Sequence, residues 1–151
     1  MSRPKHLASE TQFYFVTTNI EGHSQIFTSP NTARTVIDSI YFLRARGYLK
    51  LHAFVIMPDH LHLIISTPSD KTLPQIMHSL KSFSSKKINK QMGRTGKVWQ
   101  DGYYAYGIRG PRDMEVKMRY LLENPVRKGL SQDIITYSYS SGNGTFEVDS
   151  W

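Results

Sequence analysis

The chain has 151 residues, a length that fits one domain, residues 1–151, with one hydrophobic core. Hydrophobic residues make up 39% of it and charged residues 21%, which excludes collagen-like, disordered and low-complexity chains. The 19 Lys and Arg residues outnumber the 12 Asp and Glu residues and give a formal net charge of +7, and no apolar run approaches the ~20 residues that span a bilayer.

The N-terminal residues 1–6 are basic, but no apolar stretch follows them, so we expect no secretory signal. The chain contains no cysteine. This excludes disulfides, thiolate metal sites and cysteine nucleophiles, and it favours a reducing, cytoplasmic location.

The first half of the sequence predicts one strand, one helix and two further strands. Residues 12–20 are rich in aromatic and β-branched residues, which is typical of a strand. A helix is expected to begin at Ser29–Pro30 and to end at Gly47, with an apolar stripe formed by Ala33, Val36, Ile37, Ile40 and Leu43. Residues 49–66 predict two strands interrupted near Pro58–Asp59, because proline cannot donate a hydrogen bond inside a sheet.

The second half predicts two more helices around a fourth strand. A helix is expected over residues 73–92, with these side chains facing the core: Leu73, Ile76, Met77, Leu80, Phe83 and Ile88. A strand is expected over residues 98–108, a helix from Gly110–Pro111 to Asn124–Pro125, and a loop or small appendage from Ser131. The order β-α-β-β-α-β-α predicts an α+β domain, in which helices pack on an antiparallel sheet.

The surplus of positive charge is concentrated in residues 71–100, which contain no acid. The cations of this segment are Lys71, Lys81, Lys86, Lys87, Lys90, Arg94 and Lys97. A basic stripe is typical of proteins that bind a polyanion, because neutralised phosphates release condensed counterions. A solvated helix face with no partner is the alternative interpretation, and the sequence alone leaves both open.

Two histidines form the first candidate site. His60 and His62 are two residues apart in a predicted strand, so both rings point to one face, while Leu61, Leu63 and Ile65 point to the other and can fill the core. Two imidazoles on one face can hold a divalent ion together with a further oxygen or amide ligand, and without cysteine the site suits Mg, Mn or Zn. The alternative is a pair of partly buried histidines without a metal.

A tyrosine on the third helix forms the second candidate site. The apolar residues Met114, Met118, Leu121 and Leu122 make one stripe, and Tyr120 lies about 145° from its centre, so we expect it to face outward. Asn124 follows one turn later, about 40° away around the helix axis. A tyrosine becomes a nucleophile when a metal polarises the phosphate that it attacks. The sequence does not show whether the fold brings Tyr120 to the histidines.

These motifs together resemble one protein family, the bacterial single-tyrosine transposases that carry a histidine–hydrophobic–histidine ("HUH") strand. The resemblance covers nearly the whole chain and rests on these stretches: Met57–Ile65 around the histidine pair, Val98–Tyr104 with its Trp-Gln-x-x-Tyr pattern, Ile108–Arg109, Tyr120–Leu130 and Tyr137–Ser141. The Asn-Pro-Val-Arg-x-Gly-Leu ending resembles the branch associated with repetitive extragenic palindromes (REP).

The resemblance implies a ferredoxin-like fold and cleavage of single-stranded DNA, often beside a hairpin, without ATP. It implies that Tyr120 attacks the scissile phosphate to form a 5′-phosphotyrosine, and that His60 and His62 bind Mg or Mn. Asn124 falls where related enzymes carry a metal-binding glutamine, and Asp59 is a partner or an extra ligand beside the first histidine. The resemblance further implies a homodimer, with a monomer as the alternative.

The resemblance gives the basic residues and the aromatic residues a common role. Lys81, Lys86, Lys87, Lys90, Arg94 and Lys97 would follow the DNA backbone. Tyr103, Tyr104 and Tyr106 are candidates for stacking on unpaired bases, whereas we expect Trp99 in the core. Two other hypotheses remain: a DNA- or RNA-binding protein on the same fold that does not cut, and a metal-dependent hydrolase in which Tyr120 is not the nucleophile.

Overall fold

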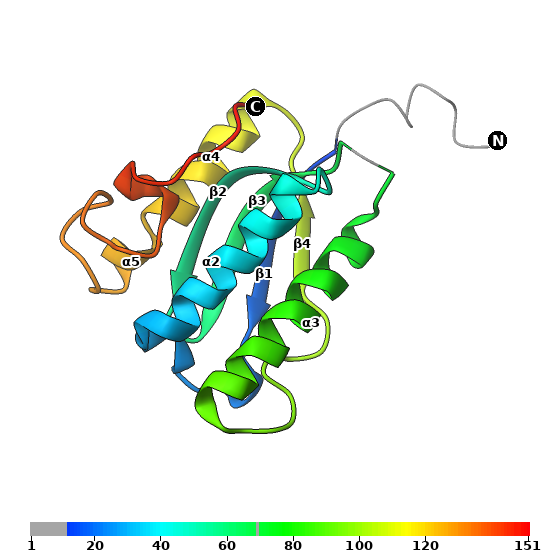
Figure 1. Ribbon diagram of the computed structural model, residues 1–151. Coiled ribbons are helices and arrows are strands. Elements are labelled where there is room, and N and C mark those ends of the chain that lie inside the picture. Colours follow the sequence, from blue (N-terminus) through cyan, green and yellow to red (C-terminus); the bar gives the residue numbers. More distant parts are fainter. Residues whose placement is uncertain (1–11, 69) are drawn as a thin grey trace.

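Helices cover both faces of the central sheet (Figure 1). The computed structural model describes residues 12–68 and 70–151, so the basic residues 1–6 lie outside the described residues. The antiparallel strands are ordered β2-β3-β1-β4, with these bounds: β1 Phe13–Asn19, β2 Lys50–Met57, β3 His60–Ser66 and β4 Tyr104–Gly107. This strand order is that of a ferredoxin-like fold, and the predicted α+β class is confirmed.

Two helices pack side by side on one face of the sheet, α2 (Pro30–Ala45) and α3 (Leu73–Met92) (Figure 1). Their bounds confirm the prediction, because the signals are local. Pro30 begins α2, and Thr72 and Gln75 form a reciprocal capping box at the start of α3. The other face carries α4 (Pro111–Leu122), followed by the short α5 (Asn124–Arg127).

The strand alternation separates a core from a polar site. Leu61, Leu63 and Ile65 of β3 are buried in the core beneath α2 and α3, as predicted. His62 therefore points to the opposite face, where Ile64 joins the smaller apolar cluster beneath α4. The histidines and α4 thus share one face of the sheet.

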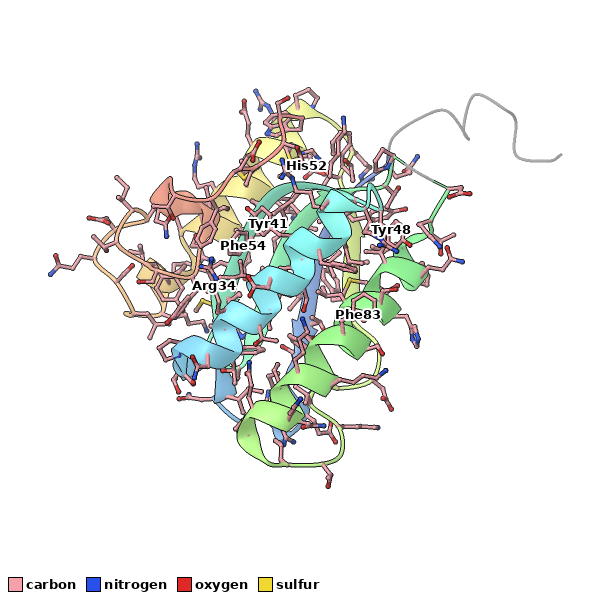
Figure 2. The ribbon with its side chains drawn as sticks, viewed as in Figure 1. Arg34, Tyr41, Tyr48, His52, Phe54 and Phe83 are labelled. Atoms are coloured by element: carbon pink, nitrogen blue, oxygen red, sulfur yellow. The ribbon has the colours of Figure 1, made fainter. Side chains whose placement is uncertain are left out.

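One predicted core residue is wrong, since Phe83 is exposed on the outside of α3 and its ring packs edge-on against Phe42 at 5.5 Å (Figure 2). Ser84 takes the inward position of this helical turn. Its hydroxyl donates to the carbonyl of Leu80 at 2.7 Å and accepts the indole N–H of Trp99 at 2.9 Å. A pattern of apolar residues cannot predict a polar residue at a core position. The prediction that Trp99 lies in the core is confirmed by its burial.

Two predicted boundaries are also wrong. Only Tyr104–Gly107 of the expected strand over residues 98–108 pairs as a strand, because Gly102 adopts a positive φ of 74° and turns the chain. The third helix ends at Leu122 rather than at Asn124–Pro125. Pro125 has no N–H to donate to the carbonyl four residues before it, so the helix is interrupted and the short α5 starts at Asn124.

The segment from Ser131, expected as a loop or appendage, contacts the outer edge of β2 through residues between Tyr137 and Asp149. The amide of Ile56 donates to the carbonyl of Tyr139 at 2.8 Å, and the amide of Leu51 donates to the carboxylate of Asp149 at 2.8 Å. The guanidinium of Arg44 in α2 donates twice to the same carboxylate, at 2.8 and 3.0 Å. The segment is therefore part of the fold.

The helices of the described residues are all too short or too polar to cross a membrane.

His52 gives the fold a dependence on pH. Burial lowers the pKa of its imidazole, whose nitrogens lie 2.8 Å from the Ser66 hydroxyl and 2.9 Å from the Asp149 carbonyl (Figure 2). The unfolded chain binds the proton at a higher pH than the folded chain, so the free energy of unfolding should decrease as the pH falls below about 6.5. Urea titrations at pH 7.5 and 5.5 should show this loss, and His52→Asn should reduce its size.

The control for this prediction is His78→Asn, because His78 is exposed on α3. This variant should keep the pH dependence of the unmodified protein. An unchanged pH dependence in His52→Asn would contradict the assignment to His52.

Candidate active site

The two histidines stand side by side at the start of β3. In the pairing with β1, His60 lies opposite Asn19 and His62 opposite Thr17. Their ring centroids are 4.8 Å apart with the ring planes at 82°. The Thr17 hydroxyl lies 2.8 Å from Nδ1 of His62, and Oδ1 of Asp59 lies 2.7 Å from Nδ1 of His60. These contacts occupy the Nδ1 atoms, so Nε2 is the nitrogen of each ring left for a ligand.

The electrostatic surroundings keep His62 neutral. Burial, with smaller contributions from the nearby charges of His60, Arg127 and Lys128, lowers the pKa of His62 to about 3. Its ring is therefore uncharged throughout the physiological pH range. A neutral imidazole offers a lone pair, which is what metal coordination requires.

Tyr120 lies beside this pair. It projects from α4 and is 49% exposed, as its helical position predicts. Its ring centroid lies 6.3 Å from that of His62 and 5.9 Å from that of Phe15, with edge-on geometry in both cases. A cleft joins these groups, and its lining residues are Phe15, Thr17, His62, Tyr104, Lys117 and Tyr120. The phenol and the imidazole thus open into one cavity.

The packing of α4 fixes the direction in which Tyr120 points. Met114 and Leu121 of this helix are buried against the sheet. At the start of the helix the carboxylate of Asp113 accepts the backbone N–H of Arg109 and the hydroxyl of Tyr106, both at 3.0 Å. The N–H of Arg109, followed by the smaller effects of Tyr106 and Lys117, lowers the pKa of Asp113. These contacts join α4 to β4 beside the cleft.

Asn124, whose amide is expected as a third metal ligand, lies beyond α4 on the next short helix. Asn124 is only 2% exposed and begins α5. Among the described residues no hydrogen bond joins its side chain to His60 or His62, although the effect of Arg127 on His62 shows that α5 lies near the histidines. The part of the chain that the structure describes contains no cluster of three or more His, Cys, Asp or Glu residues able to hold a metal ion.

The six basic residues do not form one uniform stripe. Lys86, Lys87 and Lys90 are exposed on α3, which covers the face of the sheet opposite Tyr120. The ammonium group of Lys81 instead donates to the carbonyls of Gln100 and Gly102, at 2.7 Å each, and burial lowers its pKa. At the end of α3, Arg94 donates to the carbonyl of Lys97, and Lys97 pairs with Asp101 at 2.8 Å. Lys81 therefore has a structural role in holding the loop before β4.

Two residues near the site were not singled out from the sequence, Thr17 and Arg127. The alternation of residues 12–20 places Thr17 on the same face as Phe15, but only the register between β1 and β3 places it opposite His62. Arg127 stands seven residues after Tyr120, and the break between α4 and α5 brings its guanidinium 4.1 Å from the centroid of the Tyr120 ring. The position of Thr17 depends on a contact between residues far apart in sequence, and that of Arg127 depends on the break between two helices.

Comparison with known proteins gives a consistent result. The family model described as "Transposase IS200 like" matches residues 10–124 of the chain. A protein of Escherichia coli strain K12, the "REP-associated tyrosine transposase", is 23% identical over 147 residues, which cover 90% of this chain and 82% of that protein. A Haemophilus influenzae protein, provisionally described as a REP-associated tyrosine transposase, is 27% identical over 99 residues. That match covers 59% of this chain and only 56% of the length of the Haemophilus protein.

The fold is similar to that of a solved structure. A REP-associated tyrosine transposase bound to a REP hairpin superposes with a TM-score of 0.72, covering 93% of this chain and 85% of that chain. The sequence identity in this comparison is 20%, so the likeness concerns the fold.

Proposed function

The chain belongs to the IS200-like transposase family, and from that premise we propose that it nicks and joins single-stranded DNA through a covalent tyrosine intermediate. The observation that carries the proposal is the meeting of three side chains from distant parts of the sequence. Tyr120 from α4 lies beside His62, and His62 lies beside His60, on one face of the sheet. The test is a covalent DNA adduct that forms with manganese and requires Tyr120.

The histidine pair fits a divalent metal ion, and we propose Mg or Mn. Thr17 and Asp59 hold the two Nδ1 atoms and fix the ring orientations, so Nε2 of each ring is the proposed ligand atom. Asn124 is the proposed third ligand, since α5 lies near His62 and an amide oxygen suits these metals. When bound, the metal would supply charge that polarises the scissile phosphate.

In the proposed reaction the phenol oxygen of Tyr120 attacks the scissile phosphorus. A bond forms between this oxygen and phosphorus, the bond to the 3′-oxygen breaks, and the strand departs with a 3′-hydroxyl while the phenol proton passes to water and the 3′-oxygen takes one up. The phosphate ester is conserved in the tyrosyl link, so attack by another 3′-hydroxyl joins strands without ATP. The role of this chain is to hold the phosphate between Tyr120 and the histidines.

We propose single-stranded or hairpin DNA as the partner. The relative bound to a REP hairpin has the same fold, and this chain has two hollows that are lined by the consecutive residues Tyr103 and Tyr104. A groove along α3, lined in part by His78, Lys97 and Tyr103, leads toward β4. Tyr104, at the start of β4, lines the Tyr120 cleft. A strand that passes the β4 edge would contact α3 at one end and the cleft at the other, with Tyr104 available for stacking on a base.

The exposed basic residues of α3 provide a separate test of DNA binding, since they lie outside the groove and the cleft. Replacing Lys86, Lys87 and Lys90 together by alanine should weaken binding of single-stranded DNA at least about 10-fold at 0.1 M salt, because up to three phosphate contacts are lost. The slope of log K against log salt should fall by about 2, since each contact to a single strand contributes about 0.7. Fluorescence anisotropy across a salt series measures both quantities.

Lys50→Ala serves as the control, because Lys50 is an exposed lysine at the start of β2, outside residues 71–100. Its salt dependence should match that of the unmodified protein. A triple variant with an unchanged slope would show that α3 is a solvated helix face.

The assembly and location follow from the same premise. We propose a homodimer as the working form, with a monomer as the alternative, acting in the cytoplasm. One alternative function, binding of DNA or RNA without cutting, would use the exposed lysines of α3 alone. The adduct experiment separates it from the proposal, because a protein that only binds forms no covalent product.

A further inference from the structure

Arg127 makes two contacts with one residue, Tyr120. Its guanidinium carbon lies 4.1 Å from the centroid of the Tyr120 ring. A terminal guanidinium nitrogen also donates to the backbone carbonyl of Tyr120 at 2.7 Å. The two residues lie on either side of the helix break after Leu122, and Arg127 of α5 reaches the last turn of α4. Arg127 is thus anchored to the backbone of the same residue whose ring it contacts.

The Tyr120 ring has few other restraints. Phe15 and His62 contact it edge-on, at 5.9 and 6.3 Å between centroids. The residue is about half exposed, and an exposed tyrosine on a helix can exchange between side-chain rotamers. A cation stacked on a ring favours the rotamer that keeps the contact. The planar guanidinium suits this role better than an ammonium group, since it can stack and donate in a fixed direction together.

We propose that Arg127 is a positioning residue that holds the phenol of Tyr120 beside His62. This inference rests on the proposed role of Tyr120 as the nucleophile. A different role is an ordinary helix cap, in which Arg127 satisfies a carbonyl at the C-terminal end of α4 and stabilises the helix only. The two roles make different demands on the side chain, because a cap needs a donor whereas positioning also needs a stacked, planar cation.

Three substitutions at this position separate the roles. Arg127→Lys keeps a cationic donor, Arg127→Gln keeps a planar donor without charge, and Arg127→Met keeps neither. The matched control is Arg112→Met, which removes an exposed arginine from the first turn of α4, eight residues before Tyr120. Thermal unfolding of each variant measures the capping contribution independently of any reaction.

The reaction arm measures adduct formation in a single turnover on a single-stranded hairpin with manganese. We expect Arg127→Met to lower the rate about 30- to 100-fold, the cost of a nucleophile displaced by about 1 Å, while DNA affinity changes less than about 3-fold. Arg127→Lys should restore the unfolding temperature but not the rate, and Arg112→Met should leave the rate unchanged. A variant Arg127→Lys or Arg127→Gln with the full rate would overturn the proposal.

The second arm needs no DNA and no metal. With 3-fluorotyrosine at position 120, the ¹⁹F resonance reports the surroundings of this ring directly. We expect Arg127→Met to move the resonance toward that of a solvent-exposed tyrosine, and Arg112→Met to leave it in place. An unmoved resonance in Arg127→Met would overturn the proposal. If the resonance moves but the unmodified protein forms no adduct, the positioning contact stands and the proposed function fails.

Discussion

Replacing Tyr120 by phenylalanine should abolish the covalent DNA adduct while leaving DNA binding intact. The substitution removes the phenol oxygen, which is the only atom of this side chain able to attack phosphorus. The ring remains, so its packing against Phe15 and His62 and its contact with Arg127 persist. Denaturing gel electrophoresis of protein incubated with a labelled single-stranded hairpin and manganese should show no adduct, a loss of more than about 1,000-fold.

Two further measurements make this result specific. Because the site is exposed, the free energy of unfolding should change by less than about 0.5 kcal/mol, and the dissociation constant for DNA should stay within about 2-fold. Tyr48→Phe removes a phenol oxygen far from the cleft, beside Lys71, and should keep the adduct. An adduct that persists in Tyr120→Phe would assign the nucleophile to another hydroxyl, with Tyr103 and Tyr104 as the next candidates.

Replacing His60 by alanine should remove metal-dependent cleavage. The substitution takes away one of the two imidazole nitrogens proposed to hold the metal. Loss of a group that only orients a metal ligand typically lowers metal affinity or activity about 10- to 100-fold. Loss of the ligand itself should cost at least as much. Removing the metal with a chelator should have the same effect on the unmodified protein. Calorimetric titration with Mn²⁺ measures the binding loss directly, and the adduct assay measures its consequence.

The control for this experiment is His78→Ala, an exposed histidine on α3. It should keep metal binding, because α3 packs against the core on the face of the sheet opposite the histidine pair. Thr17→Val should fall between the two variants, because it removes the hydroxyl beside Nδ1 of His62 but no ligand. Undiminished, metal-dependent cutting by His60→Ala would show that the histidine pair is not the metal site.

Local signals explain which elements the sequence predicts well. The bounds of α3 follow from a capping box at Thr72 and a glycine at the other end, Gly93, whose φ of 61° closes the helix. The two faces of β3 follow from the alternation between histidines and leucines over residues 60–63. Tyr120 faces outward for the same kind of reason, since helical periodicity relates each residue to its near neighbours only.

The errors arise where distant contacts override local patterns. An apolar pattern assigns Phe83 to the core, but the indole of Trp99 makes a hydrogen bond that favours Ser84 at the inward position. The DNA contact predicted for Lys81 stays a prediction, but no local pattern indicates that the carbonyls of Gln100 and Gly102 hold its ammonium group. The approach of Tyr120 to His62 depends on how α4 crosses the sheet, which no spacing in the sequence encodes.

The C-terminal segment determines which border of the sheet can accept another strand. The outward-facing backbone groups of β2 are already occupied: those of Leu51 by Asp149, those of Phe54 by Ser141 and those of Ile56 by Tyr137 and Tyr139. An incoming β-strand would have to displace this whole segment before it could extend the sheet at β2. Any growth of the sheet by strand addition, between copies or during misassembly, is therefore directed to the opposite border, at β4.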